Sequence, residues 1–346
     1  MATTLTGENG LGTANTATAA GLPLVSICIP AFNAERFIAE TLESALAQTY
    51  PNIEILVSDD ASTDRTLETV RLYVDRGVRL LVQPQNLGRY GNCNAVIRAS
   101  IGKYICKLDA DDLIAPEYVS ELVSTLEDHP EVGFAHCACK LVDIDGKFIG
   151  YERSIRGSFI RSGFQEWPRY VFGPRAVNIV MIRKSAFELV GGYDERYRYS
   201  GDWAMHRALL RMGSVYYDDH VVATYRCHDF GKAGVRLLQA KEHLMHLKDM
   251  ENHWPEQVSG KACLLRASRR HLALATARSS AYVSGKERRE ILNLVPAYGG
   301  GLEARLISTV INLGAGALVR VYDRGKSVLR QWIKLAMYKR LGPRPT

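Results

Sequence analysis

The sequence lacks the marks of several common protein classes. No run of about 18 or more residues is both uncharged and mostly apolar, so we expect no transmembrane helix. The seven cysteines are an odd number without any C-x-x-C pair, which argues against a disulfide framework and favours a reducing compartment. Residues 1–22 have neither a basic start nor an apolar centre, so we predict a disordered leader rather than a signal peptide.

Positive charge is concentrated near the C-terminus. Residues 301–346 hold nine Lys or Arg and two acids, which accounts for the whole net charge of +7 among 346 residues. The other residues balance 35 basic against 35 acidic side chains, so we do not expect a nucleic-acid partner. Within this region, residues 320–340 predict an amphipathic helix with a basic face, which suits an anionic membrane surface. A helix packed on the rest of the protein or in a dimer interface is the alternative.

Short apolar runs alternate with segments of helical periodicity. This alternation predicts an α/β fold with a mostly parallel central sheet. Asn33 is expected to cap the first helix, residues 151–175 look irregular, and strand signals fade after about residue 232. We therefore predict an α/β domain over residues 23–235 and a helical region over 236–346. The first four strands are expected at Leu24–Ile29, Ile53–Val57, Val78–Val82 and Tyr104–Leu108.

Acidic residues follow two of these strands. Ligands of open α/β sheets bind beyond the carboxyl ends of the strands, where Asp59-Asp60 and Asp109–Asp112 are expected. Asp109 and Asp111 are two residues apart, so an extended chain would place their carboxylates on the same side. Carboxylate oxygens are the ligands that Mg²⁺ and Mn²⁺ prefer, which predicts a divalent-cation site. A solvated acidic turn is the alternative interpretation.

Three segments, taken in order and with their spacing, resemble the family 2 glycosyltransferases. They are Val25–Asn33, Ser58–Asp64 and Leu108–Asp112, and the resemblance extends over about residues 23–230. It implies the GT-A fold, a nucleotide-sugar donor, a divalent cation and inversion at the transferred sugar. The sequence departs from two other enzyme classes: no G-x-G-x-x-G follows the first strand, and no nucleophile elbow is evident.

The resemblance also implies roles for single residues on the nucleoside side of the donor. Pro30, Ala31 and Asn33 match positions at the end of the first strand whose backbone contacts the nucleoside. Asp60 matches the aspartate that reads a uracil base, and Asp59 lies beside it. Because a carboxylate accepts a hydrogen bond from the N3–H of uracil or thymine, a UDP or dTDP donor is favoured.

Further roles concern the diphosphate and the metal. The resemblance implies Asp111 as the direct metal ligand and Asp109 as a contact to the ribose or the metal shell. Arg89 and Asn94 match a segment that lines the donor pocket, with ordinary surface helix as the alternative. His228 matches a histidine that approaches the diphosphate or the metal, although a lone histidine is more often structural.

The catalytic base is expected at Asp202. The segment Tyr199–His206 resembles the family's acidic pair followed by an aromatic residue, but Gly201 replaces the usual glutamate. This departure puts in doubt how Asp202 is oriented and how its proton affinity is set.

The sequence therefore predicts an inverting glycosyltransferase. Its acceptor would be a hydroxyl of a glycan or lipid-linked glycan, in cell-surface polysaccharide assembly, at the inner face of the cytoplasmic membrane. A nucleotide-sugar-forming nucleotidyltransferase is one alternative, although Ile29–Asn33 lacks the glycine-rich loop it would need. An inactive, membrane-associated nucleotide-sugar-binding module is the other. A homo-oligomer stays open.

Overall fold

The structure is a computed structural model that describes residues 3–5, 21–173, 179–228, 235–283, 285–299 and 308–309. At residues 3–5 only the backbone is described. Contacts divide the chain into two units, Met1–Cys227 and His228–Thr346, which we describe separately. The predicted boundary near residue 235 lies a short way further along the chain.

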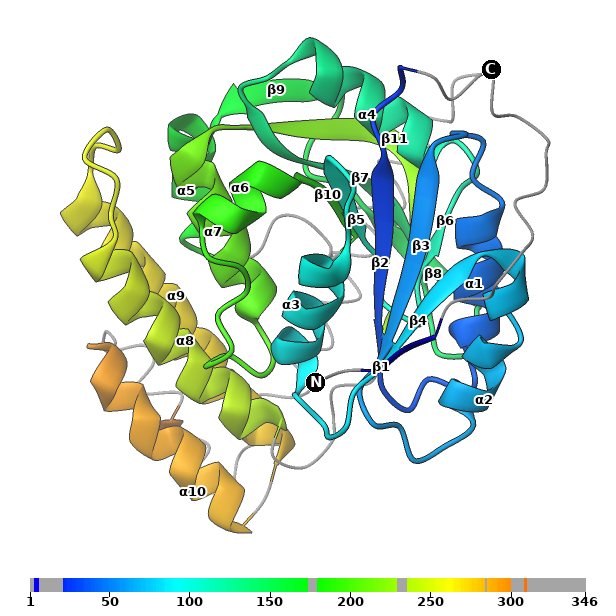
Figure 1. Cartoon of the computed structure of the whole chain (residues 1–346). Helices are drawn as coiled ribbons and strands as arrows, with labels where there is room; N and C mark the ends of the chain where they lie inside the picture. Colours follow the sequence, from blue (N-terminus) through cyan, green and yellow to red (C-terminus); the bar gives the residue numbers. More distant parts are fainter. Residues whose placement is uncertain are drawn as a thin grey trace. The chain divides into compact units, whose positions relative to one another are not determined.

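The first unit is built on one mixed β-sheet (Figure 1). Its strands follow the order β1-β4-β3-β2-β5-β10-β7-β11-β6, with β8 paired to β7 and β9 paired to β11. The strands are β1 (Thr3–Leu5), β2 (Val25–Ala31), β3 (Ile53–Asp59), β4 (Val78–Val82), β5 (Tyr104–Lys107), β6 (Leu113–Ile114), β7 (Val132–Val142), β8 (Phe148–Glu152), β9 (Phe159–Ser162), β10 (Val180–Arg183) and β11 (Ser214–Arg226).

Some neighbouring strands of the sheet are parallel and others are antiparallel. Strands β4, β3, β2 and β5 are parallel, as the alternating pattern predicts. Beyond them β10 lies antiparallel between β5 and β7, and β7 pairs parallel with β11. The predicted α/β class is confirmed, but the expected mostly parallel sheet is parallel from β4 to β5 and mixed beyond β5.

Helices cover both faces of the sheet. Figure 1 shows α1 and α2 on one face and α3 with α7 on the other. The β2 residues Ile27 and Ile29 belong to the core that contains Ile38 and Leu42 of α1. A strand buried on both faces reads as a continuous apolar run, which explains the strong signal at residues 24–29. The helices of this unit are α1 (Ile38–Leu46), α2 (Thr66–Arg71), the 3₁₀ turn η1 (Val74–Arg76), α3 (Arg89–Ala99), α4 (Tyr118–Asp128), α5 (Gly163–Tyr170), α6 (Lys184–Leu189) and α7 (Gly201–Met212).

Three local predictions need correction. Asn33 does not cap a helix, because α1 begins at Ile38 and Asn33 has a left-handed backbone with φ of +50°. Residues 151–175 are not irregular throughout, since they contain β9 and α5, whose capping box at Ser162 and Gln165 defines the helix start. In the predicted disordered leader, residues 3–5 form β1 on the edge of β4, where they pair an otherwise open strand.

The described elements of the second unit are all helical, as predicted for the C-terminal region. Tyr298 links its parts: its hydroxyl donates to the carbonyl oxygen of Ala240 and accepts from Thr276 Oγ1 at 3.0 Å. The elements are α8 (Val235–Asn252), α9 (Lys261–Ser279), η2 (Ser280–Tyr282), α10 (Gly285–Leu294) and η3 (Val295–Tyr298).

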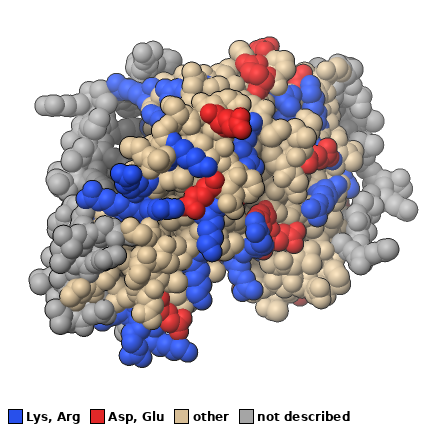
Figure 2. All heavy atoms as spheres, turned by 90° about the vertical axis from the view of Figure 1, so that its left-hand side faces the viewer, with Lys and Arg blue, Asp and Glu red and all other residues tan. Residues whose placement is uncertain are grey.

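Basic side chains are prominent in this unit and on one face of the molecule. Helix α9 contains five Lys or Arg and neither Asp nor Glu. Figure 2 shows more Lys and Arg than Asp and Glu on the face it presents. The predicted basic helix over residues 320–340 lies outside the described residues. Among the residues that are described, no helix is long and apolar enough to cross a membrane.

Candidate active site

The nucleoside-binding residues expected from the sequence meet where β2 and β3 end. The two strands are in parallel register, with Pro30 opposite Ser58 and Ala31 opposite Asp59. The backbone N–H of Asp60 donates to the carbonyl oxygen of Ala31 at 2.9 Å. Adjacent strand ends of a parallel sheet therefore place these residues at one edge, as expected.

Asp60 anchors the loop that precedes α3. Its Oδ1 accepts from the backbone N–H of Leu87 at 2.7 Å, and its Oδ2 accepts from that of Gly88 at 3.1 Å. Burial raises the pKa of Asp60, although both amides act in the opposite direction. Each carboxylate oxygen has a second lone pair, so one further donor could still be accepted.

Asp59 has an acceptor atom without a hydrogen-bond partner. Its Oδ2 accepts from the backbone N–H of Ser62 at 3.1 Å, whereas its buried Oδ1 has no hydrogen-bond partner. An unsatisfied buried carboxylate oxygen is costly, and a donor group of a ligand or a water would relieve that cost.

Asn33 joins the two loops beside these aspartates. Its backbone N–H donates to Ser62 Oγ at 3.0 Å, and its Oδ1 accepts from the backbone N–H of Thr63 at 2.8 Å. Asparagine tolerates the left-handed conformation better than most residues, which explains its presence at this position. The side chain thus holds the edge together, while contact with a nucleoside stays a prediction.

The acidic segment after β5 is a tight turn. The backbone N–H of Asp112 donates to the carbonyl oxygen of Asp109 at 3.1 Å, so the extended chain that we expected at Asp109–Asp111 is wrong. Asp112 is buried, and its Oδ1 accepts from the backbone N–H of Arg226 at 2.8 Å. Burial is the largest cause that raises the pKa of Asp112, and the charges of Asp111 and Asp109 raise it further. Asp109 and Asp111 are partly exposed, whereas the buried Asp112 carboxylate accepts its hydrogen bond inside the protein.

Lys107 is a site residue that we did not single out from the sequence. Its side chain is 1% exposed, and its Nζ lies 2.6 Å from Asp109 Oδ1. A buried ammonium group requires such a partner. The available signal was a lysine at the end of an apolar strand, immediately before the acidic turn. Asp109 is engaged in this ion pair, and its contact to the ribose or the metal shell stays a prediction.

Asp202 lies in the first turn of α7, near these charges. The backbone N–H of Trp203 donates to its Oδ1 at 2.9 Å. Burial raises the pKa of Asp202, and the charge of Asp109 adds to this effect. The Trp203 amide, Lys107 and Arg89 lower this pKa, but the net change is upward. A carboxylate with a raised pKa is a stronger general base than an ordinary aspartate.

Arg89 provides the cation of this group. It is exposed to solvent and is the first residue of α3. Desolvation lowers the pKa of Arg89, but the charges of Asp109 and Asp202 help to raise it overall. An arginine at the start of a helix is suited to hold a diphosphate, and the place of Arg89 in the donor pocket stays a prediction.

Asn94 has a different set of contacts. Its Nδ2 donates to the carbonyl oxygen of Tyr193 and to Glu195 Oε1, both at 2.9 Å. Its Oδ1 accepts from the backbone N–H of Tyr193 at 2.8 Å. Both amide hydrogens are thus used within the protein, which favours a structural role over the expected contact with the donor.

His228 is the first residue of the second unit. Its expected place beside the diphosphate or the metal therefore stays a prediction.

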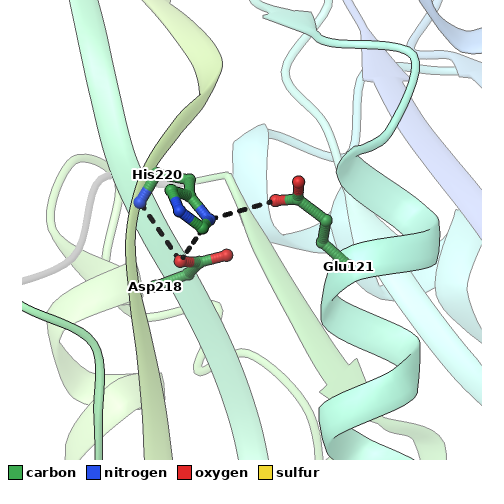
Figure 3. Close-up of side chains that lie close together, drawn as sticks. All are labelled: Glu121, Asp218 and His220. Carbon is green, nitrogen blue, oxygen red and sulfur yellow. Dashed lines mark hydrogen bonds and ion pairs between the residues drawn. The ribbon is translucent and has the colours of Figure 1, made fainter. Parts of the chain in front are cut away.

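A separate cluster of titratable side chains lies between α4 and β11. Figure 3 shows Glu121, Asp218 and His220, whose ligand-type atoms all lie within 4.8 Å of one another. His220 Nδ1 is 3.3 Å from Asp218 Oδ1 and 3.8 Å from Glu121 Oε2. Burial raises the pKa of Glu121, and the charge of Asp218 adds to this effect. Contacts of an imidazole with two carboxylates account for the cluster. Sequence reasoning did not find it because Glu121 in α4 is far along the chain from Asp218 and His220 in β11.

Comparison with known proteins decides the family. The model of "Glycosyl transferase family 2" matches residues 26–191. An uncharacterised glycosyltransferase of Rickettsia typhi is 30% identical over 227 residues, which span 64% of this chain and 69% of that protein. The chain belongs to glycosyltransferase family 2. The chondroitin synthase of Escherichia coli is 28% identical over 203 residues, 57% of this chain and 28% of that enzyme.

Solved structures of other glycosyltransferases have the same fold as this chain. Staphylococcus aureus TarS, residues 1–349, superposes with a TM-score of 0.63 at 15% identity, covering 87% of this chain and 91% of that one. TarS has also been solved with UDP-GlcNAc. The mannosyltransferase PcManGT of Pyrobaculum calidifontis, solved with GDP-Man and Mn²⁺, gives a TM-score of 0.55 at 20% identity, over 91% of this chain and 86% of that one. The predicted GT-A fold is confirmed.

Proposed function

We propose that this glycosyltransferase transfers a sugar, with inversion, from a nucleotide-diphosphate donor to a hydroxyl of a glycan or lipid-linked glycan. The observation that carries the proposal is that α3 holds the start of α7: the hydroxyl of Tyr90, the neighbour of Arg89, accepts from the backbone N–H of Asp202 at 3.3 Å. The charge of Asp109 acts on both Arg89 and Asp202. A base, a contact to the donor and a cation for the diphosphate are the parts that this reaction requires.

On the donor side, we assign the base and ribose to the edge formed by β2 and β3. Asp59 Oδ1 lacks a hydrogen-bond partner, and Asp60 keeps acceptor capacity next to it. Either carboxylate suits the N3–H of uracil or thymine, so we favour UDP or dTDP. The backbone at Pro30, Ala31 and Asn33 would border the nucleoside. The complex of TarS with UDP-GlcNAc supports a donor of this class.

A divalent cation, Mn²⁺ or Mg²⁺, fits the acidic turn. Asp111 would hold it directly, and Asp109, paired with Lys107, would stand in the outer shell. His228 is proposed as a further ligand. When bound, the ion neutralises the charge that develops on the departing diphosphate. The Mn²⁺ in the mannosyltransferase complex supports this assignment.

Asp202 would act as the general base. Its carboxylate accepts the proton of the acceptor hydroxyl as that oxygen attacks the anomeric carbon, a contribution of typically about 10²–10⁴-fold in rate. With a single base and no protein nucleophile, the configuration at the sugar inverts. Arg89 holds the diphosphate in line with the attack.

We further propose a part in polysaccharide assembly, which the chondroitin synthase relative supports. The catalytic domain would extend over residues 23–235. The helical region 236–346 would place it peripherally at the cytoplasmic face of a membrane, where the basic residues of 301–346 and α9 face anionic lipid.

Hydrolysis of a panel of nucleotide sugars tests the proposal. We expect turnover of one donor with Mn²⁺ or Mg²⁺, loss of turnover with EDTA, and recovery when the ion is restored. Asp111→Asn should not recover, and Asp202→Asn should bind the donor but turn over at least about 10²-fold more slowly. Asp75→Asn changes an exposed aspartate in η1 and serves as control. Full turnover by Asp202→Asn would refute the base assignment.

A further inference from the structure

The ring of Tyr90 occupies the space beside Gly201. A Cβ at residue 201 would lie 2.6 Å from Cε2 and 2.8 Å from Cδ2 of that ring, closer than real Cβ contacts allow. Residue 201 must therefore be glycine while Tyr90 is present, and the two residues form a complementary pair. Gly201 is also the first residue of α7, immediately before Asp202.

The hydroxyl of Tyr90 is hydrogen-bonded to the start of the same helix. It accepts from the backbone N–H of Asp202 at 3.3 Å and donates to the carbonyl oxygen of Tyr199 at 2.9 Å. The N-cap residue Ser200 makes no side-chain cap to α7. An unpaired amide in the first turn of a helix needs an acceptor, and here α3 supplies it from a distant part of the sequence.

Tyr90 is itself fixed in place. Its side chain is 1% exposed, and its ring stacks on Tyr193 with the centroids 5.4 Å apart and an interplanar angle of 21°. Asn94 in turn holds the backbone of Tyr193 through its amide group. Burial raises the pKa of Tyr90, so its hydroxyl remains protonated and available as a donor. Because Tyr90 is fixed in this way, its hydrogen bonds also fix the start of α7.

We propose that Tyr90 is a positioning residue for Asp202. It takes no part in the chemistry. Its ring fills the space beside Gly201, and its hydroxyl holds the backbone N–H of Asp202, the residue that carries the base. The inference rests on the proposed role of Asp202 as the base. It also explains how Asp202 is oriented although Gly201 replaces the usual glutamate. A tyrosine of α3 holds α7 at this point, and no side chain at residue 201 is needed.

Tyr90→Phe tests the role of the hydroxyl while keeping the ring. The matched control is Tyr50→Phe, which removes a buried hydroxyl that donates to the carbonyl oxygen of Pro23 at 2.7 Å, away from Asp202. Amide hydrogen exchange is the first readout, on the full chain without ligand. We expect the Asp202 amide to exchange roughly tenfold faster in Tyr90→Phe, as loss of one hydrogen bond implies, and to be unchanged in Tyr50→Phe.

Turnover of the nucleotide sugar that the wild type hydrolyses is the second readout. We expect Tyr90→Phe to lower kcat by roughly tenfold with KM for the donor nearly unchanged. In an Asp202→Asn background the same substitution should have no further effect, because Tyr90 acts through Asp202. An equal loss in both backgrounds, or an unchanged kcat in Tyr90→Phe, would overturn the proposal.

The two readouts separate two kinds of failure. If the wild type turns over no donor, the proposed function fails by itself, and hydrogen exchange still decides whether Tyr90 holds the start of α7. If Tyr90→Phe leaves the exchange of the Asp202 amide unchanged, the positioning role fails whatever the activity.

Discussion

The buried ion pair of Lys107 and Asp109 should be essential to the stability of the site. The Lys107 side chain is 1% exposed and that of Asp109 is 14% exposed, with 2.6 Å between Nζ and Oδ1. At this distance an effective dielectric constant of about 20 gives an attraction of about 6 kcal/mol. Desolvation of both groups offsets much of it, so the pair itself contributes little net stability, but removal of one partner leaves a charge uncompensated. We therefore expect Lys107→Met to lower the free energy of unfolding by about 3–5 kcal/mol.

Denaturant unfolding of the full chain measures this loss. Lys103→Met is the control, because Lys103 is also 2.6 Å from a carboxylate, that of Glu127, but the two side chains are 50% and 38% exposed. An exposed pair contributes about 1 kcal/mol or less. The double variant Lys107→Met/Asp109→Asn removes both charges and should regain most of the stability. Equal losses in Lys107→Met and Lys103→Met would refute the reasoning from burial.

Two further measurements probe the site and the sheet. Because the pKa of Asp202 in the free enzyme is raised, its protonated and inactive form persists to higher pH. We therefore expect kcat/KM to fall on acidification at a midpoint above 3.8, the ordinary value for aspartate. A pH profile of kcat/KM with a midpoint at or below that value would contradict the assignment. A Cβ at Gly102 would lie 2.4 Å from Ser26 Oγ and 2.7 Å from Ser26 N, so Gly102→Ala should cost about 1–3 kcal/mol in thermal unfolding. Gly133→Ala, whose nearest neighbours are 3.9 Å away, should cost less, and the reverse order would count against the steric argument.

Local patterns predicted the strands well and the loops poorly. The runs that gave β2 and β5 are buried almost throughout, and those of β3 and β4 are buried at most positions, so their signal is strong in the sequence. Asn33 resembles a helix cap in the sequence but binds Ser62 and Thr63 of another loop. The acidic turn was taken as extended, because nothing local revealed that Asp112 would turn inward to the backbone of Arg226. In each case the deciding hydrogen bond joins residues far apart in the chain.

The sequence by itself determined the alternation of strands and helices, the positions of the acidic residues at strand ends, and the family. Periodicity depends on neighbouring residues, and the motifs depend on their order and spacing along the chain, so neither needs the folded structure. Only the tertiary structure decided that the carboxylate of Asp109 pairs with Lys107. A lysine requires an ionic partner when its ammonium group is buried, and burial depends on the fold. It also decided why residue 201 is glycine, since Tyr90 reaches Gly201 only when α3 and α7 pack together. Burial and close approach are properties of the folded chain, and the proton affinity of Asp202 depends on both.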